Sequence, residues 1–222
     1  MTIAITISLV IIALIFFAAA ILSSLRSAHK KALEESYWEM SDKELLLLID
    51  SQPDKLLDAD MVARSTSLST KEAKMRIRNL TYKGLLKIAS SHGGFKYYYS
   101  LIQPIRKGPY PTLSSDPFLT VSDLMILFKF FDYRLSLQDI CLSTGLPINV
   151  IKEEMKYFVK KEIIKQVTAR VGDGVTYLSS ARFYILMDPY RSNPDAYLEQ
   201  ENEIDLELGE IYNKSGLRDK ME

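Results

Sequence analysis

The sequence repeats one pattern of apolar residues after 78 positions, and this repeat limits the folds that the chain can adopt. The stretch ARSTSLST, which begins at Ala63, aligns with CLSTGLPI, which begins at Cys141. At the same offset the apolar residues match in pairs: Leu57 with Leu135, Val62 with Ile140, Leu68 with Leu146, Ala73 with Ile151, Ile77 with Met155, Leu80 with Phe158, and Leu85 with Ile163. Two copies of one supersecondary plan are the economical explanation.

Each copy predicts three helices followed by a hairpin. The intervals between apolar residues predict first helices at Asp42–Asp50 and Val121–Tyr133, with Ser41 and Thr120 as N-caps. Second helices are expected at Asp58–Ser65 and Ser136–Thr144, and long third helices at Thr70–Leu86 and Ile148–Ile164. Glycine turns then separate pairs of β-like stretches: Leu86–Ser90 from Phe95–Leu101, and Lys165–Val171 from Val175–Ser180.

This order of elements resembles the winged helix-turn-helix superfamily. The resemblance is carried by AxxxxL in the second helix and turn, by the apolar ladder that ends in KGLLKI or KEIIKQ, and by the glycine hairpin. It covers about two-thirds of the 222 residues and implies a mainly α fold with small β wings. The second copy departs from the pattern, because Glu162 stands where the first copy has Gly84. We therefore expect its third helix to end later or differently.

The resemblance implies that the third helix of each copy enters the major groove of DNA, while the wing contacts the backbone. The residues assigned to this role are Thr70, Lys71, Lys74 and Arg78 in the first copy, Asn149, Lys152, Lys156 and Lys160 in the second, and Lys96 and Arg170 on the wings. Lysine and arginine bind phosphates with release of counterions, and a helix fits the major groove.

The same residues also suit a plain solvated helix face, since Lys, Glu and Arg are common at exposed helical positions. Glu153 and Glu154 lie among the lysines of the second helix and would repel phosphate. We call the basic residues on each third helix a basic ridge. For the ridge of the second copy the solvated face is the favoured interpretation, and for the ridge of the first copy both interpretations stay open.

Residues 1–25 contain no charged side chain, and the run is long enough to span a bilayer as a helix. The basic residues Arg26, His29, Lys30 and Lys31 follow at once, which predicts that the rest of the chain faces the cytoplasm. A cleaved signal peptide is the main alternative, but such a peptide has a basic start and a shorter apolar core. The expected localisation is therefore a single-pass protein of the cell membrane, in contact with lipid through residues 1–25.

The predicted organisation continues with a juxtamembrane stalk (26–40), a first winged-helix domain (41–103), a Pro-rich linker (104–117), a second winged-helix domain (118–187) and an acidic tail (188–222). The tail has a net charge of −6, with an amphipathic stretch around Leu198, Ile204 and Leu208. It suits a groove on a partner protein, a return onto the basic ridges, or a frayed terminus.

Nothing in the sequence indicates an enzyme, a cofactor or a metal site. The single cysteine, Cys141, and the two histidines, His29 and His92, form no ligand pattern. The sequence therefore predicts a membrane-anchored DNA-binding protein, either a tethered transcriptional regulator or a chromosome anchor. The alternative is a membrane-anchored scaffold, or a subunit of a membrane complex, whose winged helices dock partner proteins.

Overall fold

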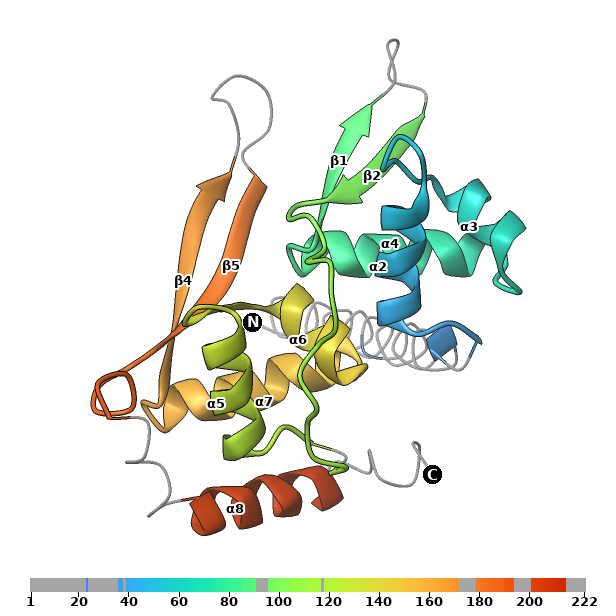
Figure 1. The fold of residues 1–222 in the computed structure, drawn as a ribbon. Helices are drawn as coiled ribbons and strands as arrows, with labels where there is room; N and C mark the ends of the chain where they lie inside the picture. Colours follow the sequence, from blue (N-terminus) through green and yellow to red (C-terminus); the bar gives the residue numbers. More distant parts are fainter. Residues whose placement is uncertain are drawn as a thin grey trace, which may run out of the picture.

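The computed structural model describes residues 23, 36–37, 39–90, 96–116, 118–171, 179–193 and 201–214, and these form two modules of helices with small antiparallel sheets (Figure 1). The first module contains α2 (Asp42–Ser51), α3 (Ala59–Ser65) and α4 (Thr70–Tyr82), followed by the hairpin of β1 (Leu86–Ser90) and β2 (Tyr97–Leu101). In this hairpin Ile88 lies opposite Tyr99.

The second module has the same order of helices and one more strand. Its elements are α5 (Val121–Phe130), β3 (Arg134–Ser136), α6 (Leu137–Thr144), α7 (Ile148–Lys160), β4 (Ile164–Val171) and β5 (Ser179–Leu186). The strand β5 pairs with both others in the sheet order β3-β5-β4. The third helices α4 and α7 begin and end at the same 78-residue offset, as the repeat predicts.

The prediction that the third helix of the second module, α7, ends later or differently is wrong. Glu162 adopts the left-handed conformation (φ 59°) that Gly84 adopts (φ 80°) after α4. In both modules the amide of the next residue donates a hydrogen bond to a carbonyl of the helix. Leu85 donates to Leu80, and Ile163 donates to Phe158. Glu162 therefore takes a conformation that favours glycine, and the helix still stops at the equivalent residue.

The first helix of the second module is shorter than predicted. Asp132 and Tyr133 have positive φ (55° and 60°) and end the helical run that the apolar pattern extends to Tyr133. The chain then forms β3, whose Leu135 pairs with Tyr184 of β5. The strand was missed because three residues carry too little alternation to be recognised.

The fold class and localisation expected from the sequence need a correction. Among the residues that the structure describes, no helix is long and apolar enough to cross a bilayer. The transmembrane helix was assigned to residues 1–25, which lie outside the described residues except for Ser23. The predicted transmembrane fold and single-pass membrane localisation are therefore withdrawn.

A buried carboxylate of the first module, that of Asp42, also binds the second module. Asp42, the first residue of α2, accepts a hydrogen bond from Arg76 of α4 (2.8 Å), and both side chains are fully buried. Its other carboxylate oxygen accepts from the amide of Ile148, the first residue of α7 (3.0 Å), and from the hydroxyl of Tyr37. Arg76 also donates to the carbonyls of Ser36 and Met40, both at 2.7 Å. One carboxylate thus connects α2, α4 and α7.

The linker between the modules, and Gln103 just before it, are held against the second module. Gln138 donates to the carbonyl of Gln103 (3.1 Å), and Arg106 donates to that of Phe130 (2.7 Å) while its guanidinium lies over the Phe130 ring. Ser114 donates to the carboxylate of Asp123 from both its amide and its hydroxyl. The linker thus has a defined path along one side of the molecule.

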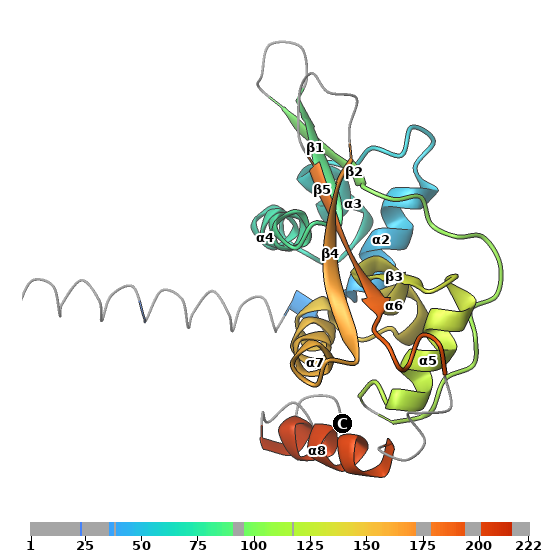
Figure 2. The same ribbon diagram turned by 90° about the vertical axis from the view of Figure 1, so that its left-hand side faces the viewer.

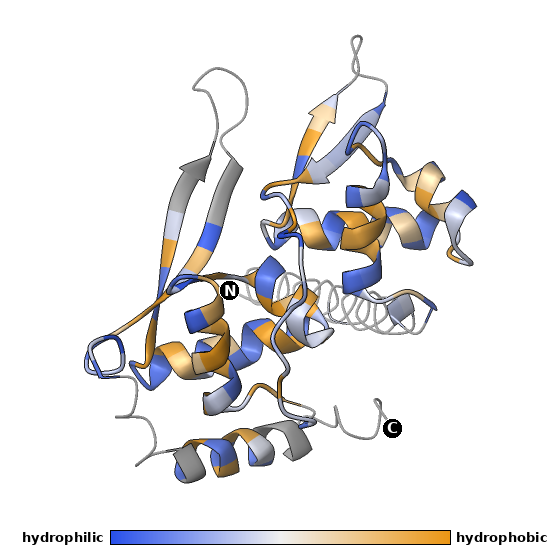
Figure 3. Ribbon diagram, in the orientation of Figure 1, coloured by the Kyte–Doolittle hydropathy of each residue, from blue (hydrophilic) through white to orange (hydrophobic). Residues whose placement is uncertain are grey.

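The acidic tail contains a helix, α8 (Glu201–Lys214), which packs under the second module (Figures 1 and 2). Hydrophobic and hydrophilic residues alternate along α8 (Figure 3), and Ile204 and Leu208 are buried. Asp205 accepts a hydrogen bond from the amide of Val121 at the start of α5 (3.0 Å). This part of the tail folds back on its own chain, against α5 and the end of α7, and not over Lys71, Lys74 and Arg78 of the first basic ridge.

We expect Asp42→Ala to destabilise the protein by about 3–5 kcal/mol, because it leaves the buried Arg76 charge without its carboxylate. Urea unfolding measures this loss. The matched control is Asp50→Ala, which breaks the exposed pair between Asp50 and Lys55 and should cost no more than about 1 kcal/mol. Equal losses for the two variants would contradict the central role of Asp42.

The second module has a buried carboxyl at the position equivalent to Arg76. Glu154 of α7 is 8 % exposed and accepts a hydrogen bond from the amide of Leu119 (3.3 Å), while its other oxygen has no partner among the described residues. Burial raises the pKa of Glu154 to about 8. The carboxyl is therefore mostly protonated in the folded protein at neutral pH.

This shift predicts how stability depends on pH. The unfolded chain releases the Glu154 proton near pH 4.5, whereas the folded chain keeps it up to about pH 8. The free energy of unfolding should therefore fall across this interval. We expect Glu154→Gln to exceed the wild type in stability by roughly 2–4 kcal/mol above pH 8, with little difference below pH 4.5. Unfolding at several pH values, with the exposed Glu162→Gln as control, checks this; a pH-independent difference would contradict it.

Candidate nucleic-acid interface

The outer face of α4 carries cations that the rest of the described chain leaves uncovered. Ser69 caps this helix and forms a capping box with Glu72, while Ala73, Ile77 and Leu80 are buried. The spacing of 3.6 residues per turn turns the opposite face outward. Thr70, Lys71, Lys74 and Arg78 on that face are all exposed, and the described residues place no carboxylate within ion-pair distance of these cations.

An aromatic side chain continues this face. Tyr82, the last residue of α4, is 81 % exposed. Helical spacing from Lys71, Lys74 and Arg78 brings Tyr82 to the same side of the helix. Cations beside an exposed ring can bind a phosphate backbone and also stack on a base or a protein side chain.

The corresponding face of α7 is less open. Asn149 and Lys152 are half-buried, whereas Lys156 and Lys160 are exposed. Lys156 donates to both oxygens of Glu153, at 2.7 and 2.9 Å. The first turn of α7 is also covered, because Ile148 is fully buried and its amide is bound by Asp42.

The two third helices lie on the same side of the molecule. In Figure 2 both α4 and α7 are seen nearly end-on, at the side opposite α5 and the linker. Figures 1 and 2 together show the two helices running roughly parallel, with the hairpins of both modules rising in the same direction. The cations of α4 and α7 therefore belong to one face, which we call the basic face.

The hairpin residues assigned to DNA contact are placed differently. Lys96, just before β2, forms an ion pair with Asp58, the N-cap of α3 (2.6 Å). Arg170 lies on β4 opposite Ser180, and its side chain is outside the described part of the structure. Lys96 therefore lies beside the start of α3 and is not part of the basic face.

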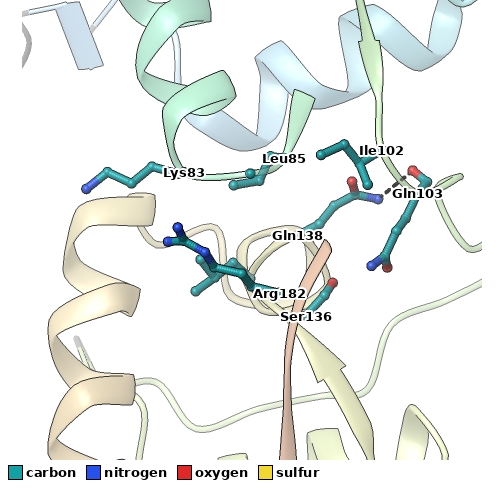
Figure 4. Close-up of a pocket in the computed structure, with 9 residues that line it drawn as sticks. Lys83, Leu85, Ile102, Gln103, Ser136, Gln138 and Arg182 are labelled. Carbon is teal, nitrogen blue, oxygen red and sulfur yellow. Dashed lines mark hydrogen bonds between the residues drawn. The ribbon is translucent and has the colours of Figure 1, made fainter. Parts of the chain in front are cut away.

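Two cations that the sequence analysis did not assign lie where the modules meet. Lys83 follows α4 directly, and Arg182 lies on β5. Figure 4 shows both side chains extending toward the same side of the junction, next to α7. Arg182 was missed because the predicted strand ended at Ser180. Lys83 was missed because it does not share the helix face of Lys71, Lys74 and Arg78.

The electrostatics of Lys83 show how close these cations are. Burial is the main cause of a lowered pKa of Lys83, and the positive charges of Lys152, Lys156 and Arg182 lower it further, while Glu153 partly opposes them. Lys83, which follows α4 in the first module, thus lies near cations of α7 and β5 in the second module.

Helix α8 limits this face at its far end. Glu207 accepts hydrogen bonds from Lys161 (2.9 Å) and from the hydroxyl of Tyr157 (2.7 Å). These bonds hold the pKa of Glu207 below its ordinary value. The acidic helix neutralises Lys161, just beyond α7, and leaves Lys71, Lys74 and Arg78 uncovered.

The described residues hold no group of His, Cys, Asp and Glu side chains that could bind a metal. The free Cys141 is buried, and burial raises the pKa of its thiol far above the ordinary value. It therefore remains a neutral core residue. No known protein-family model matches the chain, and no curated protein matches it significantly.

Proposed function

We propose that the chain binds duplex DNA through the basic face, with the two modules acting as winged helices on one duplex. The observation that supports this most directly is the row of exposed cations on α4, Lys71, Lys74 and Arg78, which no described carboxylate neutralises. Helices with small sheets are compatible with a helix-turn-helix arrangement. The match of α4 and α7 at one offset supports their use as a pair.

The balance of contacts favours the phosphate backbone over the bases. The basic face offers mainly lysines, which act as point charges, and few amide side chains that could read base edges. Asn149 is such an amide, but it is half-buried. We therefore propose a binding mode of low sequence specificity and strong salt dependence.

A second candidate function is the docking of an acidic partner protein. It is favoured by Tyr82 at the end of α4, and by Glu153, which neutralises Lys156 on α7. Tyrosine and arginine are enriched at protein interfaces. Here the basic face would bind carboxylates in place of phosphates.

The DNA proposal predicts a large effect of Lys71→Gln/Lys74→Gln/Arg78→Gln. At low salt this triple variant should bind a labelled duplex at least about 30-fold more weakly, because each charged contact contributes on the order of 1 kcal/mol or more. The salt slope, log K against log salt, should become shallower by about 0.9 for every phosphate that the variant no longer neutralises. Fluorescence anisotropy of the full chain with duplexes of several sequences measures both.

The matched control is Lys129→Gln, which removes one exposed lysine from α5 on the opposite side of the molecule (Figure 2). It should leave the affinity almost unchanged. If the wild-type chain forms no complex with any duplex at low salt, DNA binding is excluded and partner docking becomes the leading function.

A change of opposite sign tests the participation of α7. Glu153 is exposed and is the acidic residue beside Lys152 and Lys156 on this face. Glu153→Gln removes its repulsion of phosphate and frees Lys156, so duplex affinity at low salt should rise about two- to fivefold, as expected from a surface charge interaction below about 1 kcal/mol. Asp116→Asn, in the linker, is the control. An affinity equal to that of the control would show that α7 does not face the duplex.

A further inference from the structure

The junction between the modules gathers positive charge from three elements of both modules. Lys83 comes from the end of α4, Lys152 and Lys156 from α7, and Arg182 from β5. The charges of Lys152, Lys156 and Arg182 all lower the pKa of Lys83. Such a cluster is unfavourable by itself, because like charges repel.

Negative charge is scarce around this cluster. The carboxylate that acts on Lys83 is that of Glu153, and both of its oxygens accept hydrogen bonds from Lys156. Among the described residues, Lys83, Lys152 and Arg182 have no carboxylate within ion-pair distance. The protein thus holds three uncompensated cations at one place, and an anion there would relieve their repulsion.

Lys83 and Arg182 also stand beside a small cavity (Figure 4). Its wall includes Gln103, Ser136 and Gln138, and Gln138 is held by its hydrogen bond to the carbonyl of Gln103. The cavity has a volume of about 10 Å³, which is room for one water molecule. A nucleoside cannot enter it, but a tetrahedral oxyanion can lie at its edge, against the two cations.

We propose that this junction binds a phosphate group of the duplex backbone, held between Lys83 and Arg182 with Lys152 beside them. The inference rests on the proposed function and adds a defined contact to it. Arginine offers several donors in a planar fork and lysine a point charge, a combination that suits phosphate oxygens. A phosphate bound here touches both modules at once, so it fixes the register of α4 and α7 on the same strand.

The test compares the full chain with Lys83→Gln/Arg182→Gln in two measurements. The first is duplex affinity by fluorescence anisotropy, with Lys129→Gln as control and thermal unfolding as a check of folding. We expect a loss of about tenfold or more at low salt, and a salt slope shallower by about 0.9, since the variant neutralises one phosphate fewer. The second is a titration with pyrophosphate, followed by NMR of the side-chain amides of Gln103 and Gln138.

The outcomes separate the two proposals. A duplex that binds the double variant as tightly as the control, while the triple variant of α4 binds weakly, overturns the junction site and leaves the proposed function intact. Absence of duplex binding, together with saturable shifts of both amides by pyrophosphate in the wild type alone, overturns the proposed function and assigns the junction to a free phosphate compound. Absence of both overturns both.

Discussion

Asp42 places a carboxylate at the point where α2, α4 and α7 meet, and the arrangement of the two modules depends on it. A buried charge is tolerated only when it is paired and fully hydrogen-bonded. Asp42 meets this condition by accepting from Arg76, Tyr37 and the amide of Ile148. Burial and the Asp42 carboxylate raise the pKa of Tyr37 far above its ordinary value, so this hydroxyl remains a donor. Because the Ile148 amide belongs to the second module, the modules cannot turn against each other without breaking a buried hydrogen bond to the Asp42 carboxylate.

The two modules use equivalent positions in opposite ways. Arg76 and Glu154 lie at the same place on the third helix, and each contacts the residue before the N-cap of its own first helix. Arg76 donates to the carbonyl of Met40, whereas Glu154 accepts from the amide of Leu119. Arg76 is paired with the Asp42 carboxylate, whereas Glu154 has no cationic partner among the described residues, and burial raises its pKa. A shared helical plan thus supports one module by an ion pair and the other by a neutral acid.

The local elements could be predicted from the sequence, whereas the contacts between the modules could not. Capping residues such as Ser41 and Ser69 and the spacing of apolar residues act within one or two turns, so α2 and α3 were expected close to their observed bounds. The third helices α4 and α7 begin where expected but end at Tyr82 and Lys160, four residues before the predicted ends. The burial of Arg76 could not be predicted, because Asp42, the carboxylate that pairs with it, lies 34 positions away in the sequence. The junction of Lys83 with Arg182 depends on how the modules pack, as does the return of α8 onto α5. The left-handed conformation of Glu162 was missed because glycine is the residue that ordinarily adopts this conformation.

The packing that fixes the modules also bears on the proposed binding of a duplex. In helix-turn-helix proteins the first residues of the recognition helix approach the base edges. In α4 these residues, Thr70 and Lys71, are exposed, but in α7 Ile148 is buried and its amide is occupied by Asp42. The contact with Asp42 thus covers the first residue of α7, and its exposed lysines, Lys156 and Lys160, lie in the middle and last turns. In the binding mode proposed above, any reading of bases would therefore fall to α4, and α7 would contribute phosphate contacts.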